Sequence, residues 1–147
     1  MEKSIVRSPN LFLLIAAGIS VVAGLLHYAC IIVGAPLYRI LGAGEEMARL
    51  AEQGNSHPHI MALIVGSMLM VLAVFALSAA GVIRALPLTR FVLCGFVLVL
   101  TLRALLFPFL QPYFPGNSDL FWWTSSAICF GYALVHAIGL RQVWDKL

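Results

Sequence analysis

Charged residues are scarce in this sequence. Only 10% of its 147 residues are Asp, Glu, Lys or Arg, whereas 62% are hydrophobic. Soluble globular domains carry about 25% charged and about 45–50% apolar residues. The composition therefore excludes a soluble enzyme domain, and the combination of low charge with high apolar content also excludes a disordered chain. An integral membrane protein remains.

The sequence motifs of common enzymes and cofactor sites are also missing. The chain has three cysteines and no C-x-x-C pair, so it predicts neither a disulfide framework nor a thiol oxidoreductase. H-E-x-x-H, Walker and G-x-S-x-G motifs are absent, which removes the familiar hydrolase and nucleotide-binding classes. A haem held by His27 and His136 is disfavoured, because their expected depths in the membrane differ by roughly 15 Å. We therefore expect no cofactor.

What the chain does contain is four long apolar runs, which cover residues 11–33, 60–82, 91–110 and 120–140. About 20 helical residues cross a hydrocarbon core of about 30 Å. Helices satisfy their own backbone groups in lipid, and the runs lack the alternating polarity of a barrel strand. The sequence thus predicts an all-α, integral membrane four-helix bundle, in which residues 1–147 form a single domain.

Basic residues are concentrated on one side of the predicted membrane. Four spans place both termini on that side, which carries Lys3, Arg7, Arg84, Arg90, Arg141 and Lys146, whereas the other side carries Arg39 and Arg49. By the positive-inside rule both termini are cytoplasmic, and we expect the inner membrane of a bacterium. Because the basic residues are spread over three short segments, the net charge of +3 predicts no nucleic-acid partner.

The longest connection, residues 34–59, lies between the first two spans on the external side. Within residues 45–53, Met47, Leu50 and Ala51 recur three and four apart, and Gly54 follows as a helix stop. This pattern predicts a short amphipathic helix over the outer end of the bundle. Turns are expected at residues 34–36 and 42–44, with Tyr38 and Arg39 between them at the membrane surface.

Small residues recur every four positions in the first and fourth spans. The rows are Ala16, Ser20 and Gly24 in the first span, and Ser125, Cys129, Ala133 and Ala137 in the fourth. Residues four apart share one face of a helix, so we expect these rows to be helix contacts. The alternative is that apolar helices contain many small residues by chance.

Arg103 is the one formally charged residue within a predicted span. An Arg near the centre of a membrane helix costs about 2.5–3.5 kcal/mol, so it needs a partner. No span contains Asp or Glu, and we therefore expect a loop carboxylate, backbone carbonyls or a bound anion. A ligand site near the external face would then combine Arg103 with these residues: His27, Tyr28, Arg39, Glu45, Glu46 and Arg49.

Alternatives to a functional site exist for these residues. Pro108 can end the third helix early, which would leave Arg103 one turn from the interface with its side chain reaching water. His27 can be an ordinary hydrogen-bonded packing residue. His57 and His59 are weak candidates for a metal site, because residues two apart share a face only in extended backbone, and Pro58 suits a plain helix start.

Three functions follow from these features. We favour a non-catalytic accessory or assembly subunit that binds a membrane partner, a second copy of itself or lipid, because no catalytic constellation is recognisable. The alternative is a binder or transporter of a small anionic or amphiphilic ligand at the external face. The third possibility is a membrane enzyme that uses His27 or the pair His57 and His59.

Overall fold

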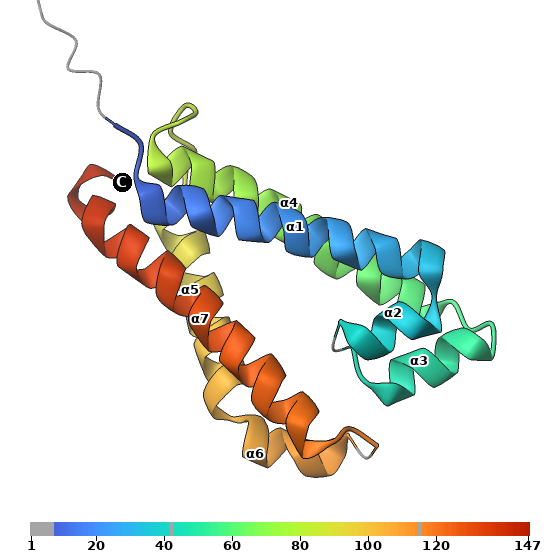
Figure 1. Cartoon of the computed structure of the whole chain (residues 1–147). Helices are drawn as coiled ribbons and strands as arrows, with labels where there is room; N and C mark the ends of the chain where they lie inside the picture. The colour runs from blue at the N-terminus through green and yellow to red at the C-terminus, as the bar shows by residue number, and fades with distance from the viewer. Residues whose placement is uncertain (1–7, 42, 115) are drawn as a thin grey trace, which may run out of the picture.

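The computed structural model describes residues 8–41, 43–114 and 116–147, and within these ranges the fold is entirely helical (Figure 1). The all-helical prediction is confirmed for this part of the chain. The elements in chain order are α1 (Leu11–Val33), α2 (Ala35–Ile40), α3 (Glu45–Glu52), α4 (His57–Ala80), α5 (Thr89–Leu105), α6 (Phe107–Leu110), the 3-10 helix η1 (Gln111–Tyr113), α7 (Asp119–Val143) and the 3-10 helix η2 (Trp144–Lys146).

Local signals account for the ends of the three longest helices. Before α1, the side chain of Asn10 accepts a hydrogen bond from the N–H of Leu13 at 3.0 Å. Before α7, the hydroxyl of Ser118 accepts one from the N–H of Phe121 at 3.2 Å. Such caps satisfy N–H groups that have no partner inside the helix. Helix α4 ends at Gly81, whose φ of 82° is a left-handed conformation that glycine adopts without steric cost.

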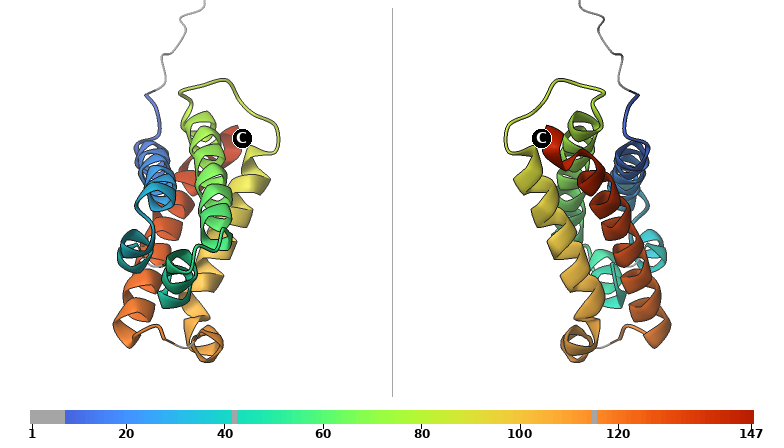
Figure 2. Two further views of the ribbon diagram at one scale, coloured as in Figure 1. Left: turned by 90° about the vertical axis from the view of Figure 1, so that its right-hand side faces the viewer. Right: turned by 90° about the vertical axis from the view of Figure 1, so that its left-hand side faces the viewer.

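The long helices form two hairpins, in which α1 packs along α4 and α5 packs along α7 (Figure 2). Helix α1 begins and α7 finishes at the same end of the molecule, where Asn10 Nδ2 donates to Gln142 Oε1 at 2.8 Å. We call this the terminal end. Helices α2 and α3 lie at the opposite end and together form what we call the lid. We call that end of the molecule the lid end.

The two hairpins share a core near the terminal end, where Leu13 of α1, Ala80 of α4, Leu93 of α5 and Leu140 of α7 are buried together. At the lid end the first hairpin has a core of its own, in which Cys30 and Ala62 pack against the lid. Figure 1 shows the hairpins diverging from the terminal end toward the lid end.

The predicted row of small residues on α1 is confirmed as a helix contact. Ala16, Ser20 and Gly24 are all buried. A Cβ atom on Gly24 would lie 3.1 Å from the carbonyl oxygen of Gly66 on α4, so the two backbones approach closely at this point. On α7, only Ala133 of the predicted row is fully buried, and Ser125, Cys129 and Ala137 lie at the edge of the contact.

The third predicted span is broken, which corrects the continuous helix expected over residues 91–110. Helix α5 ends at Leu105, and the chain bends by 66° into α6 and η1. Pro108 explains the break, because its ring lacks an N–H group and clashes with the carbonyl of Ala104 four residues earlier. The early helix end that the sequence offered as an alternative is the one observed.

Three helices in the described residues are long and apolar enough to cross a membrane: Leu11–Val33, His57–Ala80 and Asp119–Lys146. The bent pair Thr89–Leu105 and Phe107–Tyr113 makes a fourth if it is counted as one span. Large apolar side chains lie exposed on every long helix, among them Ile32, Val71, Leu98 and Ile128. Continuous apolar surface of this kind suits lipid rather than water, so the fold is compatible with a multi-pass membrane protein.

The lid contains one helix, α2, that was not predicted. Gly34, with φ of 79°, ends α1, and α2 begins directly at Ala35 with Pro36 in its first turn. The expected turn at residues 34–36 is therefore a helix start, for which proline is well suited. The predicted amphipathic helix is present as α3, with Ala48 buried and Glu46 and Arg49 exposed. Gly42, part of the second expected turn, lies outside the described residues, as do Lys3 and Arg7.

Candidate functional site

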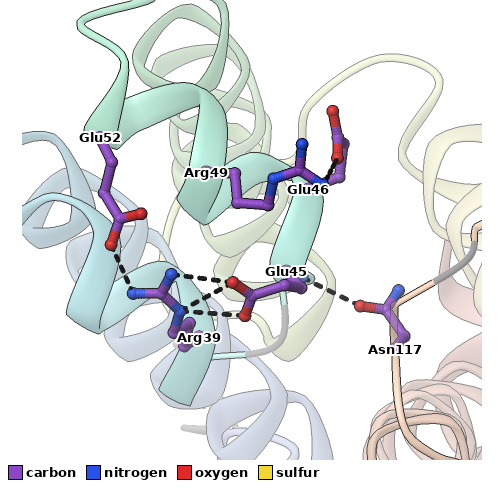
Figure 3. Close-up of polar contacts among 6 residues, drawn as sticks. All are labelled: Arg39, Glu45, Glu46, Arg49, Glu52 and Asn117. Atoms are coloured by element: carbon purple, nitrogen blue, oxygen red, sulfur yellow. Dashed lines mark hydrogen bonds and ion pairs between the residues drawn. The ribbon is translucent and has the colours of Figure 1, made fainter.

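A network of ion pairs joins the two helices of the lid (Figure 3). Arg39 of α2 forms two parallel bonds with Glu45 of α3, from Nε to Oε2 at 2.9 Å and from Nη2 to Oε1 at 2.8 Å. Its Nη1 donates to Oε1 of Glu52 at 2.8 Å. A guanidinium matches a carboxylate in this forked geometry. Arg39 and Glu45 are both predicted site residues, and the structure brings them together as partners of each other.

These bonds shift the titration of the lid carboxyl groups. Hydrogen bonds from Arg39 lower the pKa of Glu45 and of Glu52 below their usual value of 4.5. The same bonds raise the pKa of Arg39. All three groups are therefore ionised at neutral pH, and the positive charge of Arg39 is balanced within the lid rather than offered to a ligand.

Two further contacts of α3 involve predicted site residues. Arg49 Nη1 lies 3.5 Å from Glu46 Oε2, and both side chains are exposed. The N–H of Glu45 donates to the side-chain oxygen of Asn117 at 3.0 Å, which ties the lid to the segment before α7 (Figure 3). The lid is thus held by α4 beneath it and by Asn117 beside it.

A cavity of about 220 Å³ lies between the lid and the first hairpin. Its lining includes His27 and Cys30 of α1, Tyr38 of α2, Met47 of α3 and Met61 of α4. Apart from the imidazole, the thiol and the phenol, the lining is apolar, with leucine, alanine, proline and valine completing it. A concave, mostly apolar space with few polar groups is the usual form of a small-molecule site.

His27 lines the cavity and carries a hydrogen-bond acceptor without a partner among the described residues. Its Nδ1 lies 2.7 Å from the carbonyl oxygen of Ala23, one turn earlier in α1. A carbonyl can only accept, so Nδ1 carries the proton, and in the neutral ring Nε2 is left with a lone pair. Among the residues that the structure describes, none bonds to Nε2. A ligand with a hydroxyl or N–H group can use this atom.

Tyr38 forms part of the cavity wall and is fixed by His59. The tyrosine is 2% exposed, and its hydroxyl shares a hydrogen bond with Nδ1 of His59 at 3.0 Å. Burial raises the pKa of Tyr38, so the phenol stays protonated at physiological pH. His59 is therefore occupied in positioning the wall of the cavity, which is a role that its position at a helix start did not reveal.

Arg103 lies elsewhere, and its observed partners are side-chain hydroxyls, where a loop carboxylate, backbone carbonyls or a bound anion had been expected. Its Nη2 donates to the hydroxyl of Ser125 at 3.0 Å and its Nη1 to that of Ser126 at 3.2 Å. The guanidinium carbon also lies 5.0 Å from the centre of the Trp122 ring. Helix α7 thus solvates the charge by two hydroxyls and an aromatic face. Arg103 does not line the cavity that contains His27.

Tyr28 and His57 also lie apart from the cavity lining. Tyr28 packs over Gly66 and its hydroxyl lies 3.0 Å from that of Ser67. The His57 side chain is exposed, while its backbone N–H donates to Asn55 Oδ1 at 2.8 Å. No group of three or more His, Cys, Asp or Glu residues within the described ranges is arranged to hold a metal ion.

Sequence reasoning did not select most of the residues around His27. Cys30 follows His27 at helical spacing, which was a usable signal. Met47 and Met61 come from different elements, and only the docking of α3 on α4 brings them to His27. Ser125 was singled out only as a small residue and Ser126 was not singled out, although two adjacent hydroxyls in an apolar helix are also a signal for a buried charge on a neighbouring helix.

No family model, curated protein or solved structure matches this chain.

Proposed function

We propose that the chain crosses a bilayer four times, with α5, α6 and η1 forming the third crossing, and that the lid lies outside the cytoplasm. The distribution of cations supports this orientation. Arg84, Arg90, Arg141 and Lys146 lie at the terminal end, whereas Arg39 and Arg49 of the lid are each paired with glutamate. An excess of Lys and Arg marks the cytoplasmic side. The inner membrane of a bacterium is the corresponding proposal for location.

Within that frame we propose that the protein binds a small, mostly apolar or amphiphilic molecule beneath the lid. The observation that carries this proposal is the pairing of an apolar cavity with the unpartnered Nε2 acceptor of His27. The ligand would place its apolar body against Met47 and Met61 and donate a hydrogen bond to His27. A cavity of about 220 Å³ is smaller than the roughly 300–1,000 Å³ of drug-sized pockets. It suits a small molecule or one end of a longer one.

Charge distribution favours a neutral donor group over an anionic one. The guanidinium of Arg39 is bound by two carboxylates, and that of Arg103 by α7. Neither charge lines the cavity. An anion placed there would lose its hydration without gaining a cationic partner, which is a large cost in an apolar site.

The lid offers a route of entry. Its two helices are joined to each other by ion pairs whose side chains are 38–52% exposed for Arg39, Glu45 and Glu52. Exposed pairs contribute only about 0–1 kcal/mol each, because water competes for both charges. The ion pairs therefore add little to the cost of separating α2 from α3, whose residues Tyr38 and Met47 both line the cavity.

The test uses phenol and toluene, two probes of similar shape of which only phenol donates a hydrogen bond. The full chain is labelled with 13C at the methionine methyl groups and titrated with each probe in detergent micelles. We expect phenol to shift the Met47 and Met61 signals at lower concentration than toluene does. Met68, which is exposed on α4, reports partition of the probe into the micelle.

His27→Ala is expected to remove the preference for phenol while both probes still shift the methionine signals. His57→Ala is the matched control, because this histidine lies at the same end and does not line the cavity. Equal responses to phenol and toluene in the unmodified chain would contradict the proposal. So would a preference for phenol that survives His27→Ala, or signals of Met47 and Met61 that follow Met68.

A second candidate is the accessory or assembly subunit, supported by a feature of α7. Ala127 and Gly131 are exposed one turn apart, and no atom lies within 4 Å of a Cβ placed on Gly131. Small residues at this spacing allow another membrane helix to approach closely. If a second copy binds there, Gly131→Leu will convert a dimer to a monomer in light-scattering measurements. An unmodified chain that is monomeric in mild detergent and in nanodiscs would remove the homodimer.

A further inference from the structure

A shallow groove runs between α5 and α7 in the half of the molecule nearest the terminal end. It has a volume of about 330 Å³, and its walls are Cys94, Val97, Leu98 and Thr101 of α5 and Ala137, Leu140, Arg141 and Trp144 at the α7 side. On each helix the lining covers eight positions, a length of roughly 10 Å at about 1.5 Å per residue. The groove therefore follows the helices from their end toward the middle of the bundle.

Apart from Arg141, the walls of the groove offer a ligand almost no polar group. Thr101 is the one hydroxyl residue in the lining, and its Oγ1 donates to the carbonyl of Val97 within α5 at 2.7 Å. The exposed fraction of Leu98 is 58%, so the groove is open on its outer side. In a bilayer, acyl chains would cover this surface, and a groove of this shape can hold one chain lengthwise.

The charge at the end of the groove points to the occupant. Arg141 lies in the last turn of α7 and lines the groove next to Trp144. Within the described residues its side chain has neither a hydrogen bond nor an ion pair, and Asp145, four residues later, does not pair with it. An unpaired guanidinium at the end of an apolar groove matches the phosphate of a lipid whose chain fills that groove.

Neighbouring residues make this end of the groove rigid and basic. The guanidinium carbon of Arg90 lies 4.5 Å from the centre of the Trp144 ring. Its Nη2 donates to the carbonyl oxygen of Trp144 at 2.7 Å and to a backbone oxygen of Leu147 at 3.0 Å. Trp144 is thereby held at the place where indole rings favour the membrane interface. Asp145 and Lys146 follow Trp144 directly in η2, one acidic and one basic.

We propose that this groove binds an anionic phospholipid, with one acyl chain between α5 and α7 and the phosphate on Arg141. The proposal rests on the proposed insertion of the chain in a bilayer and is independent of the cavity beneath the lid. The excess of cations over anions at the terminal end selects a headgroup with net negative charge, whereas the groove selects a ligand that carries a long apolar chain.

The test is native mass spectrometry of the full chain, delipidated and then mixed with phosphatidylglycerol or phosphatidylcholine of identical acyl chains. We expect phosphatidylglycerol to be retained at lower concentration. Arg141→Gln should weaken its retention about fivefold, the effect of one basic residue near an anionic lipid surface. Arg84→Gln is the matched control, because Arg84 lies in the connection between α4 and α5 and does not line the groove.

The acyl chain is tested by filling the groove. Ala137→Phe should reduce retention of the lipid, and Leu98→Trp replaces it in case the first variant does not fold. Val71→Phe on the outer surface of α4 should leave retention unchanged.

Equal retention of the two lipids, or equal losses in Arg141→Gln and Arg84→Gln, would overturn the selective site. Unchanged retention in both groove variants would overturn the acyl position, and displacement by millimolar inorganic phosphate would show a free-anion site instead. Extraction of the chain from membranes by alkaline carbonate would overturn the insertion itself and is scored separately.

Discussion

The side chain of Asn117 accepts a hydrogen bond from the backbone N–H of Glu45, 72 residues earlier in the chain, at 3.0 Å. This bond connects the lid of the first hairpin to the segment that leads into α7 of the second. The buried clusters that the hairpins share lie near the terminal end and around Tyr132 in the middle of α7, so the bond joins the hairpins beyond these clusters, at the lid end. A ligand that displaces the lid would therefore act on the start of α7 as well.

The lid should loosen in acid. Hydrogen bonds from Arg39 lower the pKa of Glu45 and Glu52 below their usual value of 4.5. The stabilisation from these pairs is therefore complete above about pH 4.5 and is lost as the pH falls through the lowered values. Hydrogen exchange at residues 45–52 should be faster at pH 3 than at pH 6 after correction for the intrinsic rate. Arg39→Gln should remove most of this difference, and an equal difference in that variant would contradict the assignment.

The close approach of α1 and α4 makes Gly66 sensitive to substitution. A Cβ atom there would lie 2.7 Å from Cε1 of Tyr28. Gly66→Ala should lower the free energy of unfolding by about 1–3 kcal/mol, the usual cost of overpacking. Gly95→Ala on α5 is the control, because no atom lies within 4 Å of its added Cβ. Thermal unfolding in detergent measures both, and equal effects would show that the contact is not tight.

A buried hydroxyl pair links α1 to α7. Ser20 donates to the carbonyl of Ala16 at 2.9 Å, so its oxygen is left to accept a hydrogen bond from the hydroxyl of Tyr132. Ser20→Ala leaves the phenol buried without a partner and should cost about 1–3 kcal/mol. The double variant Ser20→Ala with Tyr132→Phe should be more stable than Ser20→Ala alone. Strictly additive losses in chemical denaturation would count against the pair.

Arg103 should stabilise the second hairpin. Arg103→Ala removes two charge-assisted bonds to Ser125 and Ser126, and each such bond contributes about 1.5–3 kcal/mol. Arg103→Lys should recover part of the loss, since an ammonium cannot reproduce the forked geometry or the stacking on Trp122. Arg49→Ala removes an exposed ion pair and serves as the control, with a cost below about 1 kcal/mol. Thermal unfolding that gives equal effects for Arg103→Ala and Arg49→Ala would exclude this role.

Much of the architecture could be predicted from local sequence. Long apolar runs require helices, and their ends follow from short-range chemistry, such as the caps at Asn10 and Ser118 and the stop at Gly81. The break after Leu105 was also encoded locally, by Pro108. The start of α2 at Ala35 was missed because Gly34 and Pro36 suit a turn and a helix start equally well.

The candidate site could be predicted only in part. The sequence singled out His27 as a polar group within a span, and Arg39 and Glu45 as charged groups in the external loop; the structure places His27 in the lining of the cavity and pairs Arg39 with Glu45. Their partners were not predictable, because contacts between helices depend on the rotation of each helix about its axis. Apolar periodicity is weak when a helix is apolar on all sides, so the sequence contains little information about that rotation.

Composition alone made the chain helical and suited to a bilayer. Backbone N–H and C=O groups without hydrogen bonds, and charged side chains, have a high free energy in hydrocarbon, whereas exposed apolar surface has a high free energy in water. Tertiary structure alone decided that Arg103 faces two serines of α7, that Arg39 is neutralised within the lid, and that Met47 and Met61 line the same cavity as His27. Those outcomes depend on how rigid helices dock on one another, and that docking is set by shape summed over many contacts rather than by any short segment.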